Sequence, residues 1–275
     1  MTATRNARLV LPGLIAAVLA ACVLVPGWIA TRSPIEVDLG QALATPGRHH
    51  FLGTDQLGRD IFARIVFGAR YSILVGLTAT LLAVLGGTLI GLCAALGGRL
   101  IDTVIARGLD IVLAFPGVLL TLLVIAMLGQ GADSLIAAIA IAESASYARL
   151  VRSQALVVRN ADYVRASIAL GRSPGYRIAR HIVPNSLRPT VVLATLGVGS
   201  SIMIGSALSF LGLGPKEPTP EWGSMLAAGR ELLSKSWWVA VPPGAAITLT
   251  VVTVTVLGRA LQQRWEGGLA RSARR

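Results

Sequence analysis

Few residues of this chain have the types and spacing that chemistry requires. Its three histidines, His49, His50 and His181, stand in predicted loops without partner ligands within reach by sequence. The two lysines, Lys216 and Lys235, are not preceded by the glycine spacing of a phosphate-binding loop. No His-Glu-x-x-His pair occurs, and the one stretch with the letters Gly-x-Ser-x-Gly, GRSPG at 171–175, lies between two predicted short helices and not at the strand-to-helix turn of a nucleophile elbow. We therefore predict no catalytic residue, no metal site and no bound cofactor, and energy for any active process must come from another chain.

One ionisable residue, Glu143, lies well inside an apolar stretch. Such residues are functional candidates in membrane proteins, here for an inner gate or path. Six residues separate it from Arg149, which places it only about 9 Å from the inner surface at 1.5 Å per residue. At that depth its carboxylate could instead reach the interface or hydrogen-bond Tyr147, one helical turn on. Both interpretations remain open from the sequence.

The composition indicates an integral membrane protein. Of 275 residues 54% are hydrophobic and 14% charged, which leaves too few polar side chains to cover a water-soluble globule. Counting spans of about 20 residues predicts an all-α polytopic fold with six transmembrane helices. They are Leu9 to Ala30, Tyr71 to Gly98, Ile111 to Ala132, Ser134 to Ala148, Pro189 to Pro215 and Val239 to Gly258.

The charge distribution predicts the orientation. With both termini cytoplasmic, the inner segments are 1–8, 99–110, 149–188 and 259–275, and they hold 17 Lys and Arg against four Asp and Glu. The outer segments hold eight of each. This asymmetry follows the positive-inside rule. The high pI therefore has a topological explanation, and we expect no nucleic-acid partner, since only 5% of residues are aromatic.

Residues 160–185, NADYVRASIALGRSPGYRIARHIVPN, form a basic loop with clear helix signals. Asn160 is a plausible N-cap, and Gly171 suits the position that follows a helix end. Ser173 and a proline then repeat the start signal, which predicts a second short helix from Gly175 to Val183, stopped by Pro184. We therefore predict two short helices at the cytoplasmic surface.

The first of these helices has one partly apolar face. Tyr163, Ala166, Ala169 and Leu170 share it by helical spacing, while Arg165 lies off it. Such a face could dock on another protein. The arginines alone would equally suit a helix resting on anionic lipid. The residues by themselves favour neither interpretation.

The same loop resembles the coupling loop of ABC-importer permeases, whose pattern is Glu-Ala-Ala, three residues, Gly, a spacer, then Ile-x-Leu-Pro. Here the matching positions are Arg165, Ala166, Ser167, Gly171, Ile182 and Pro184, preceded by Asp162-Tyr163-Val164. In that family the loop docks on a cytoplasmic ATPase. The resemblance therefore implies that these residues, Tyr163 included, couple ATP hydrolysis to the membrane helices.

Three further blocks extend the resemblance to the C-type permease subunit of dipeptide and oligopeptide importers. They are HHFLGTDQLGRDIFARIVFGARYSI at 49–73, IDTVIARGLDIVLAFPGVLL at 101–120 and SFLGLGPKEPTPEWGSML at 209–226. The resemblance implies a leading helix and external segment, 1–70, before a five-helix core, 71–275, with the coupling loop at 149–188. It also implies a bacterial inner membrane location and four partners: a second permease, ATP-binding subunits that carry ATP and Mg²⁺, an external solute-binding protein and membrane lipid.

The chain departs from the family pattern at two places. Arg165 replaces the glutamate of the coupling loop, so an ion pair made by that glutamate is not carried over. Gly205 stands where a carboxylate commonly precedes the LSFLGLG stretch. The outer loop 215–238 carries Glu217, Glu221 and Trp222. These three residues could dock an external binding protein or could simply anchor the loop at the interface.

Several alternatives remain at this level. Related importers carry nickel or other small solutes, and the sequence does not identify the solute, the residues along its path or the number of ATPase chains. A self-sufficient secondary transporter would show several intramembrane charges, broken helices and repeated halves, and apart from Glu143 the sequence gives no sign of these. Two charge pairs at i and i+3, Arg99 with Asp102 and Arg107 with Asp110, predict a helix along the inner surface. The Gly87-x3-Gly91 spacing suits close contact between helices.

Overall fold

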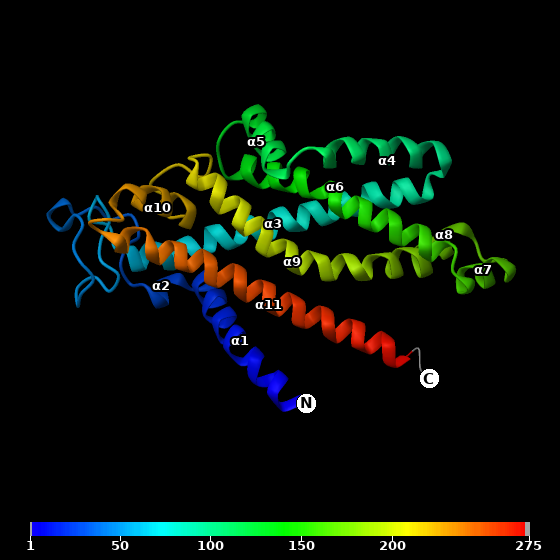
Figure 1. Ribbon diagram of the computed structural model, residues 1–275, viewed down its shortest axis with the longest axis horizontal. Coiled ribbons are helices and arrows are strands. Elements are labelled where there is room, and N and C mark those ends of the chain that lie inside the picture. Colours follow the sequence, from blue (N-terminus) through cyan, green and yellow to red (C-terminus); the bar gives the residue numbers. More distant parts are fainter. Residues whose placement is uncertain (1, 273–275) are drawn as a thin grey trace. The chain divides into compact units, whose positions relative to one another are not determined.

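The computed structural model describes the backbone of residues 2–272 and the side chains of residues 9–263. Within this range the chain is helical, and its one extended pairing is a bridge between Thr54 and Asp60 (Figure 1). The long helices are α1 Thr2–Leu24, α3 Ile61–Leu96, α4 Gly98–Ala114, α5 Gly117–Leu128, α6 Ala132–Arg159, α9 Val183–Phe210 and α11 Val241–Ser272. The short ones are α2 Pro26–Ile29, η1 Leu39–Gln41, α7 Asp162–Ala169, α8 Pro174–Arg177, the π-helix η2 Ile178–Ile182, α10 Trp222–Gly229, η3 Arg230–Leu232 and η4 Trp237–Val239.

The all-α class is confirmed, but the count of six spans is not. Four segments of the described residues are long and apolar enough to cross a membrane, namely α3, α6, residues 174–210 and residues 237–263. They coincide with the second, fourth, fifth and sixth predicted spans. The leading span is shorter than predicted, because α1 ends at Leu24 and its apolar part covers only Leu9–Leu24.

The third predicted span, Ile111 to Ala132, is not one straight helix. The chain bends by 97° between α4 and α5. Phe115 at this break is extended, with φ −81° and ψ 139°, because the ring of Pro116 disfavours the helical conformation of the preceding residue. A straight span from Ile111 to Ala132 is therefore not present, and α4 with α5 makes a fifth span only if the bent pair is counted as one.

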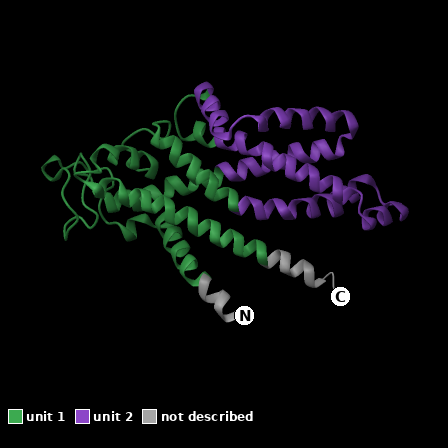
Figure 2. Cartoon of the chain, viewed as in Figure 1, with its two compact units in different colours: residues 1–78, 128–136, 196–275 green, residues 79–127, 137–195 purple. Residues whose placement is uncertain are grey.

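The chain divides into two compact units (Figure 2). Unit 1 comprises residues 1–78, 128–136 and 196–275, and unit 2 comprises 79–127 and 137–195. In unit 1, α1 and α10 both pack against α11. Its core joins the start of α3 to α10 and η4 through Ile61, Val66, Trp222 and Trp238. The 31–60 segment is fixed to this core, since the indole of Trp238 donates to the Thr54 carbonyl at 3.3 Å.

Unit 2 is built on a close contact between α3 and α6. A Cβ added at Gly87 would lie 2.6 Å from the Ser144 carbonyl oxygen, and one at Gly91 would lie 2.6 Å from that of Ala148. No residue larger than glycine fits at these distances without moving one helix. The small-residue spacing predicted for close contact is thus confirmed, and it places Ala83, Ala95 and Ala155 in the surrounding cores.

Candidate functional site

The start of α7 differs from the prediction by one residue. Ala161, with φ −69° and ψ 149°, precedes the helix, and no side chain caps it. Asn160 instead donates to the Leu156 carbonyl at the end of α6, at 2.9 Å. Asp162 occupies the first turn, where a carboxylate interacts favourably with the helix dipole.

The end of α7 follows the sequence closely. Gly171 has φ +73°, the left-handed conformation that glycine adopts without strain. Its N–H donates to the Ile168 carbonyl at 2.9 Å, and the Arg172 N–H donates to Ser167 at 3.1 Å. This pair of bonds is the Schellman motif. It fixes the direction in which the chain leaves α7.

The two faces of α7 differ in burial. Val164 and Ser167 are buried, while Tyr163 and Leu170 are 46% and 77% exposed. Ala166 and Ala169 are exposed beside them. The face that the helical spacing singled out is therefore the outward face of the helix and is open to a partner.

The second short helix begins as predicted, but the helical conformation does not end at Pro184. The Ser173 hydroxyl accepts from the Tyr176 N–H at 3.3 Å, with Pro174 in the first turn. Pro184 does not stop the helix, because the π-helix η2 widens one turn before α9 begins at Val183. The wider turn accommodates a residue that has no N–H, and the Ser186 hydroxyl donates to the Ile182 carbonyl at 2.7 Å. Ile182 is buried and Pro184 exposed.

An aromatic cluster joins the two short helices, and the sequence reasoning missed it. The His181 ring lies 5.9 Å from that of Tyr163 and 5.8 Å from that of Tyr176. The Arg172 guanidinium lies 5.1 Å from the centre of the Tyr176 ring, within range of a cation–π interaction. Tyr163 is thus 46% exposed, and it also packs on His181, which holds α7 against η2.

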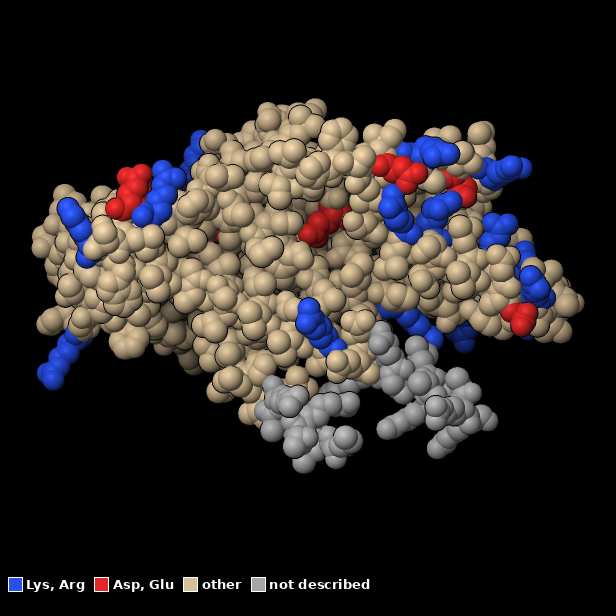
Figure 3. Space-filling view, in the orientation of Figure 1, with Lys and Arg blue, Asp and Glu red and all other residues tan. Residues whose placement is uncertain are grey.

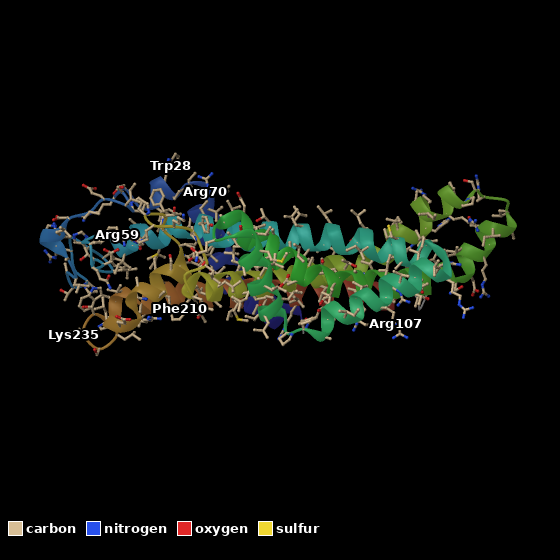
Figure 4. All side chains as sticks on the ribbon, turned by 90° about the horizontal axis from the view of Figure 1, so that it is seen from above. Trp28, Arg59, Arg70, Arg107, Phe210 and Lys235 are labelled. Atoms are coloured by element: carbon tan, nitrogen blue, oxygen red, sulfur yellow. The ribbon has the colours of Figure 1, made fainter. Side chains whose placement is uncertain are left out.

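The charges of α4 serve to hold it to α6. Asp102 accepts from Arg152 Nη2 at 2.9 Å, and Asp110 accepts from Arg149 Nη2 at 2.7 Å. The acidic side chains are therefore paired between helices rather than at i and i+3 along α4. Arg107, predicted to pair with Asp110, projects from α4 (Figure 4).

Glu143 lies in α6 and is half-buried. Tyr147, one turn on, is 3% exposed and within electrostatic reach of the Glu143 carboxylate. This placement is compatible with both interpretations from the sequence, and the role of Glu143 near an inner gate stays a prediction.

The three residues proposed for external docking separate into two groups. Glu221 and Trp222 are 2% and 1% exposed, so their side chains cannot form a docking surface, and that part of the prediction was wrong. Glu221 caps α10 by accepting from the N–H groups of Gly223 and Ser224 at 2.9 and 2.8 Å. Burial raises the pKa of its carboxyl, although these bonds oppose the rise. Glu217 remains exposed.

A cavity of about 10 Å³ lies beside Glu221, and Gly205, Ser206 and Ser209 contribute to its wall. Gly205 is the position at which the resembling permeases commonly carry a carboxylate. In this chain the carboxylate at the same cavity comes from Glu221, on the neighbouring α10. The hydroxyl of Ser206 is buried there without a hydrogen-bond partner among the described residues, whereas the Ser209 hydroxyl interacts with the Glu221 carboxylate.

Arg59 joins the 31–60 segment to the loop before α10. Its Nε donates to Asp55 at 2.6 Å and its Nη1 to Glu217 at 2.9 Å. Figure 4 shows Arg59 directed among the loops of unit 1. The hydrogen bond from Arg59 holds the pKa of Glu217 below its ordinary value of 4.5.

We expect Glu217→Gln to lower stability only slightly and in a pH-dependent way. Because the folded pKa is lowered, the carboxylate stabilises the fold above about pH 4.5, and this contribution disappears as the pH falls through the lowered pKa. The Glu217 side chain is 57% exposed, so solvent screening limits the effect to about 1 kcal/mol or less. Thermal unfolding at pH 7 and pH 4 measures the difference. Glu231→Gln, with a carboxylate that is 79% exposed, is the control, and equal behaviour of the two variants would contradict the role of Arg59.

The comparison with known proteins settles the family. Residues 87–269 match the binding-protein-dependent transport system inner membrane component family. The chain belongs to this family. The permease is also 41% identical, over 84% of its length and 78% of the relative's, to the probable D,D-dipeptide transport system permease protein DdpC of Escherichia coli K12. It is 37% identical to the di/tripeptide transport system permease protein DppC of Pseudomonas aeruginosa UCBPP-PA14, over 92% and 85% of the two chains.

Solved structures agree with this placement at the level of fold. The permease superposes on a chain of an amino acid ABC transporter crystallised with histidines with a TM-score of 0.58 at 15% identity, covering 74% of this chain and 94% of that one. A chain of the MetNI methionine ABC transporter gives a TM-score of 0.57, also at 15% identity, with 72% and 94% covered. The permease is therefore an inner-membrane component of an ABC importer, which works with ATP-binding and substrate-binding partners.

Proposed function

We propose that the permease imports dipeptides and oligopeptides that an external binding protein delivers. The support is that relatives about 40% identical are described as dipeptide, di/tripeptide and peptide transport permeases. A relative in Escherichia coli O6:K15:H31 that is 41% identical is described as a glutathione permease, and glutathione is itself a tripeptide. The common substrate chemistry is a short peptide.

The proposed assembly pairs this chain with a second, homologous permease, and both contact membrane lipid. The leading helix and external segment are residues 1–70, and the permease core is residues 71–275. Both termini lie in the cytoplasm, because the segments 149–188 and 259–275 carry most of the excess positive charge. ATP and Mg²⁺ bind to the partner ATPase, whether that consists of one chain or two. The permease chain is not an enzyme.

The observation that supports the proposed contact with the ATPase is the exposed face of α7. Tyr163, Ala166 and Leu170 lie outward, while Val164 and Ser167 face inward and Gly171 fixes the exit of the chain. A small apolar face on a locked helix is suited to insertion into a cleft of the ATPase. ATP-driven closure of that cleft would then move α7, and through η2 it would move α9. Arg165 lies off this face and gives α7 a positive charge where the family pattern has a negative one.

Affinity purification of the tagged chain from its native membrane in mild detergent tests the assembly. We expect a second permease and an ATP-binding subunit to be recovered in stoichiometric amounts. Uptake of a labelled dipeptide into proteoliposomes, with unlabelled dipeptide, glutathione and Ni²⁺ as competitors, then tests the solute. Uptake of labelled Ni²⁺ without uptake of the labelled dipeptide would replace the peptide assignment with an importer for nickel. A chain that purifies alone and still moves solute would be a secondary transporter, and Glu143 would become its central residue.

A further inference from the structure

Behind α7, unit 2 contains a cavity of about 450 Å³. Its wall is made by the end of α3, the end of α6 and the short helices α7, α8 and η2. The side chains that matter for its chemistry are Arg159, Arg165, Arg177, Val164, Ile168 and Ile178. The cavity lies on the opposite side of α7 from the exposed face around Leu170, since Val164 is one of the buried residues of that helix.

The lining of the cavity is positively charged, and the acidic group that acts on Arg159 electrostatically, Asp102, lies outside the lining. Among the described residues no carboxylate lines it, and none of its three arginines takes part in an ion pair. The Nε of Arg177 is buried without a hydrogen-bond partner, and Arg159 donates to the Ala95 carbonyl at 3.0 Å. Figure 3 shows mainly basic side chains at this end of unit 2. Arg177 is partly buried, whereas Arg159 and Arg165 are exposed. A partly buried guanidinium group with an unpartnered N–H is stabilised by an anion beside it, and the two exposed arginines are open to the same anion.

The rest of the wall restricts what that anion can be. Val164, Ile168 and Ile178 present apolar surface beside the arginines. A small hydrated anion would satisfy the charges but leave this surface in contact with water, whereas an amphiphile covers both. One guanidinium group can donate two parallel hydrogen bonds to two oxygens of a phosphate. The cavity lies at the ends of α3 and α6, two of the candidate membrane spans, and basic pockets of this kind bind lipid headgroups.

We propose that this cavity binds the phosphate group of an anionic phospholipid, with an acyl chain along the apolar residues. The lipid would link α7 to the ends of α3 and α6 and so set how firmly the coupling helix is held. This binding needs only residues of unit 2. It therefore stands independently of the solute and of the ATPase assignment.

The test is binding to the full-length chain, in the complex in which it purifies, in a neutral detergent. Native mass spectrometry measures binding of dihexanoyl phosphatidylglycerol, dihexanoyl phosphatidylcholine and inorganic phosphate. We expect phosphatidylglycerol to bind at least tenfold more tightly than the other two. Arg177→Gln should weaken its binding at least tenfold, and Arg177→Lys should retain most of it. Arg180→Gln, which removes the same charge from an exposed position outside the cavity, should change binding less than twofold.

Other outcomes would overturn the proposal. Equal weakening by Arg177→Gln and Arg180→Gln would mean that lipid meets only a general basic surface. If inorganic phosphate bound as tightly as phosphatidylglycerol, the apolar wall would not contribute to binding. If phosphatidylcholine bound as tightly as phosphatidylglycerol, the arginines would not select an anionic lipid. Circular dichroism shows whether each variant is folded. If Arg177→Gln does not fold, Arg177→Lys and Arg159→Gln provide the same comparison with Arg180→Gln.

Discussion

Replacing Gly171 by valine is expected to uncouple ATP hydrolysis from peptide uptake. Gly171 has φ +73°, and nothing lies within 4 Å of where its Cβ would be. The cost of valine is therefore confined to the backbone, at about 1–3 kcal/mol for a β-branched residue in this region. The chain relieves that strain by breaking the two bonds that Gly171 and Arg172 donate to α7. The coupling helix then no longer has a fixed exit.

The measurement compares ATPase activity and uptake in proteoliposomes that contain the complete transporter. For Gly171→Val we expect uptake at least tenfold lower, with ATP hydrolysis retained and the amount of inserted chain within twofold of the original. Gly175→Val is the matched control, because Gly175 lies in α8 without a positive φ and also has open space around it. Uptake that is equal in the two variants would contradict the coupling role of this turn.

Replacing Gly87 by leucine is expected to prevent unit 2 from folding. Its Cβ would lie 2.6 Å from the Ser144 carbonyl oxygen, 2.6 Å from Tyr147 Cβ and 2.9 Å from the Ala148 nitrogen. Two of these atoms belong to the α6 backbone and cannot turn away, so α3 and α6 must separate. Overpacking a core usually costs about 1–3 kcal/mol, and separating the helices also removes the other contacts along this interface.

The adjacent glycine provides a close control for this experiment. Gly86 has nothing within 4 Å of its Cβ position, so Gly86→Leu should be accommodated. We expect size-exclusion chromatography of detergent extracts to give a normal monodisperse peak for Gly86→Leu and a peak at least fivefold smaller for Gly87→Leu. Equal recovery of the two variants would contradict the close contact of α3 with α6 at Gly87.

The features that were predicted correctly from the sequence depend on local signals. Gly171 ends α7 and Ser173 begins α8, because a positive φ and a hydroxyl cap depend on only a few neighbouring residues. The apolar spans were found for a similar reason, since hydropathy is a property of the segment itself. The outward face of α7 also follows from helical spacing, because the burial of Val164 and Ser167 leaves the opposite face of the helix exposed.

The errors arise where a distant segment decides the outcome. Glu221 was a candidate for docking an external protein or for anchoring its loop, and the structure rules out docking because Glu221 caps α10 within a core formed with α3 and α9. The charges of α4 were expected to pair along the helix, but α6 places arginines opposite them. Pro184 was expected to end a helix, but the π turn of η2 accommodates it.

The sequence by itself determined most of the helices, the membrane class and the two short helices of the basic loop 160–185, because hydropathy, glycine conformation and helix caps act over a few residues. Only the tertiary structure decided which residues are accessible and which charges are compensated. It left Tyr163 exposed, buried Trp222 and gathered Arg159, Arg165 and Arg177 around one cavity without a carboxylate. Burial and electrostatic pairing depend on segments far apart in the chain, and no local pattern records which of them will meet.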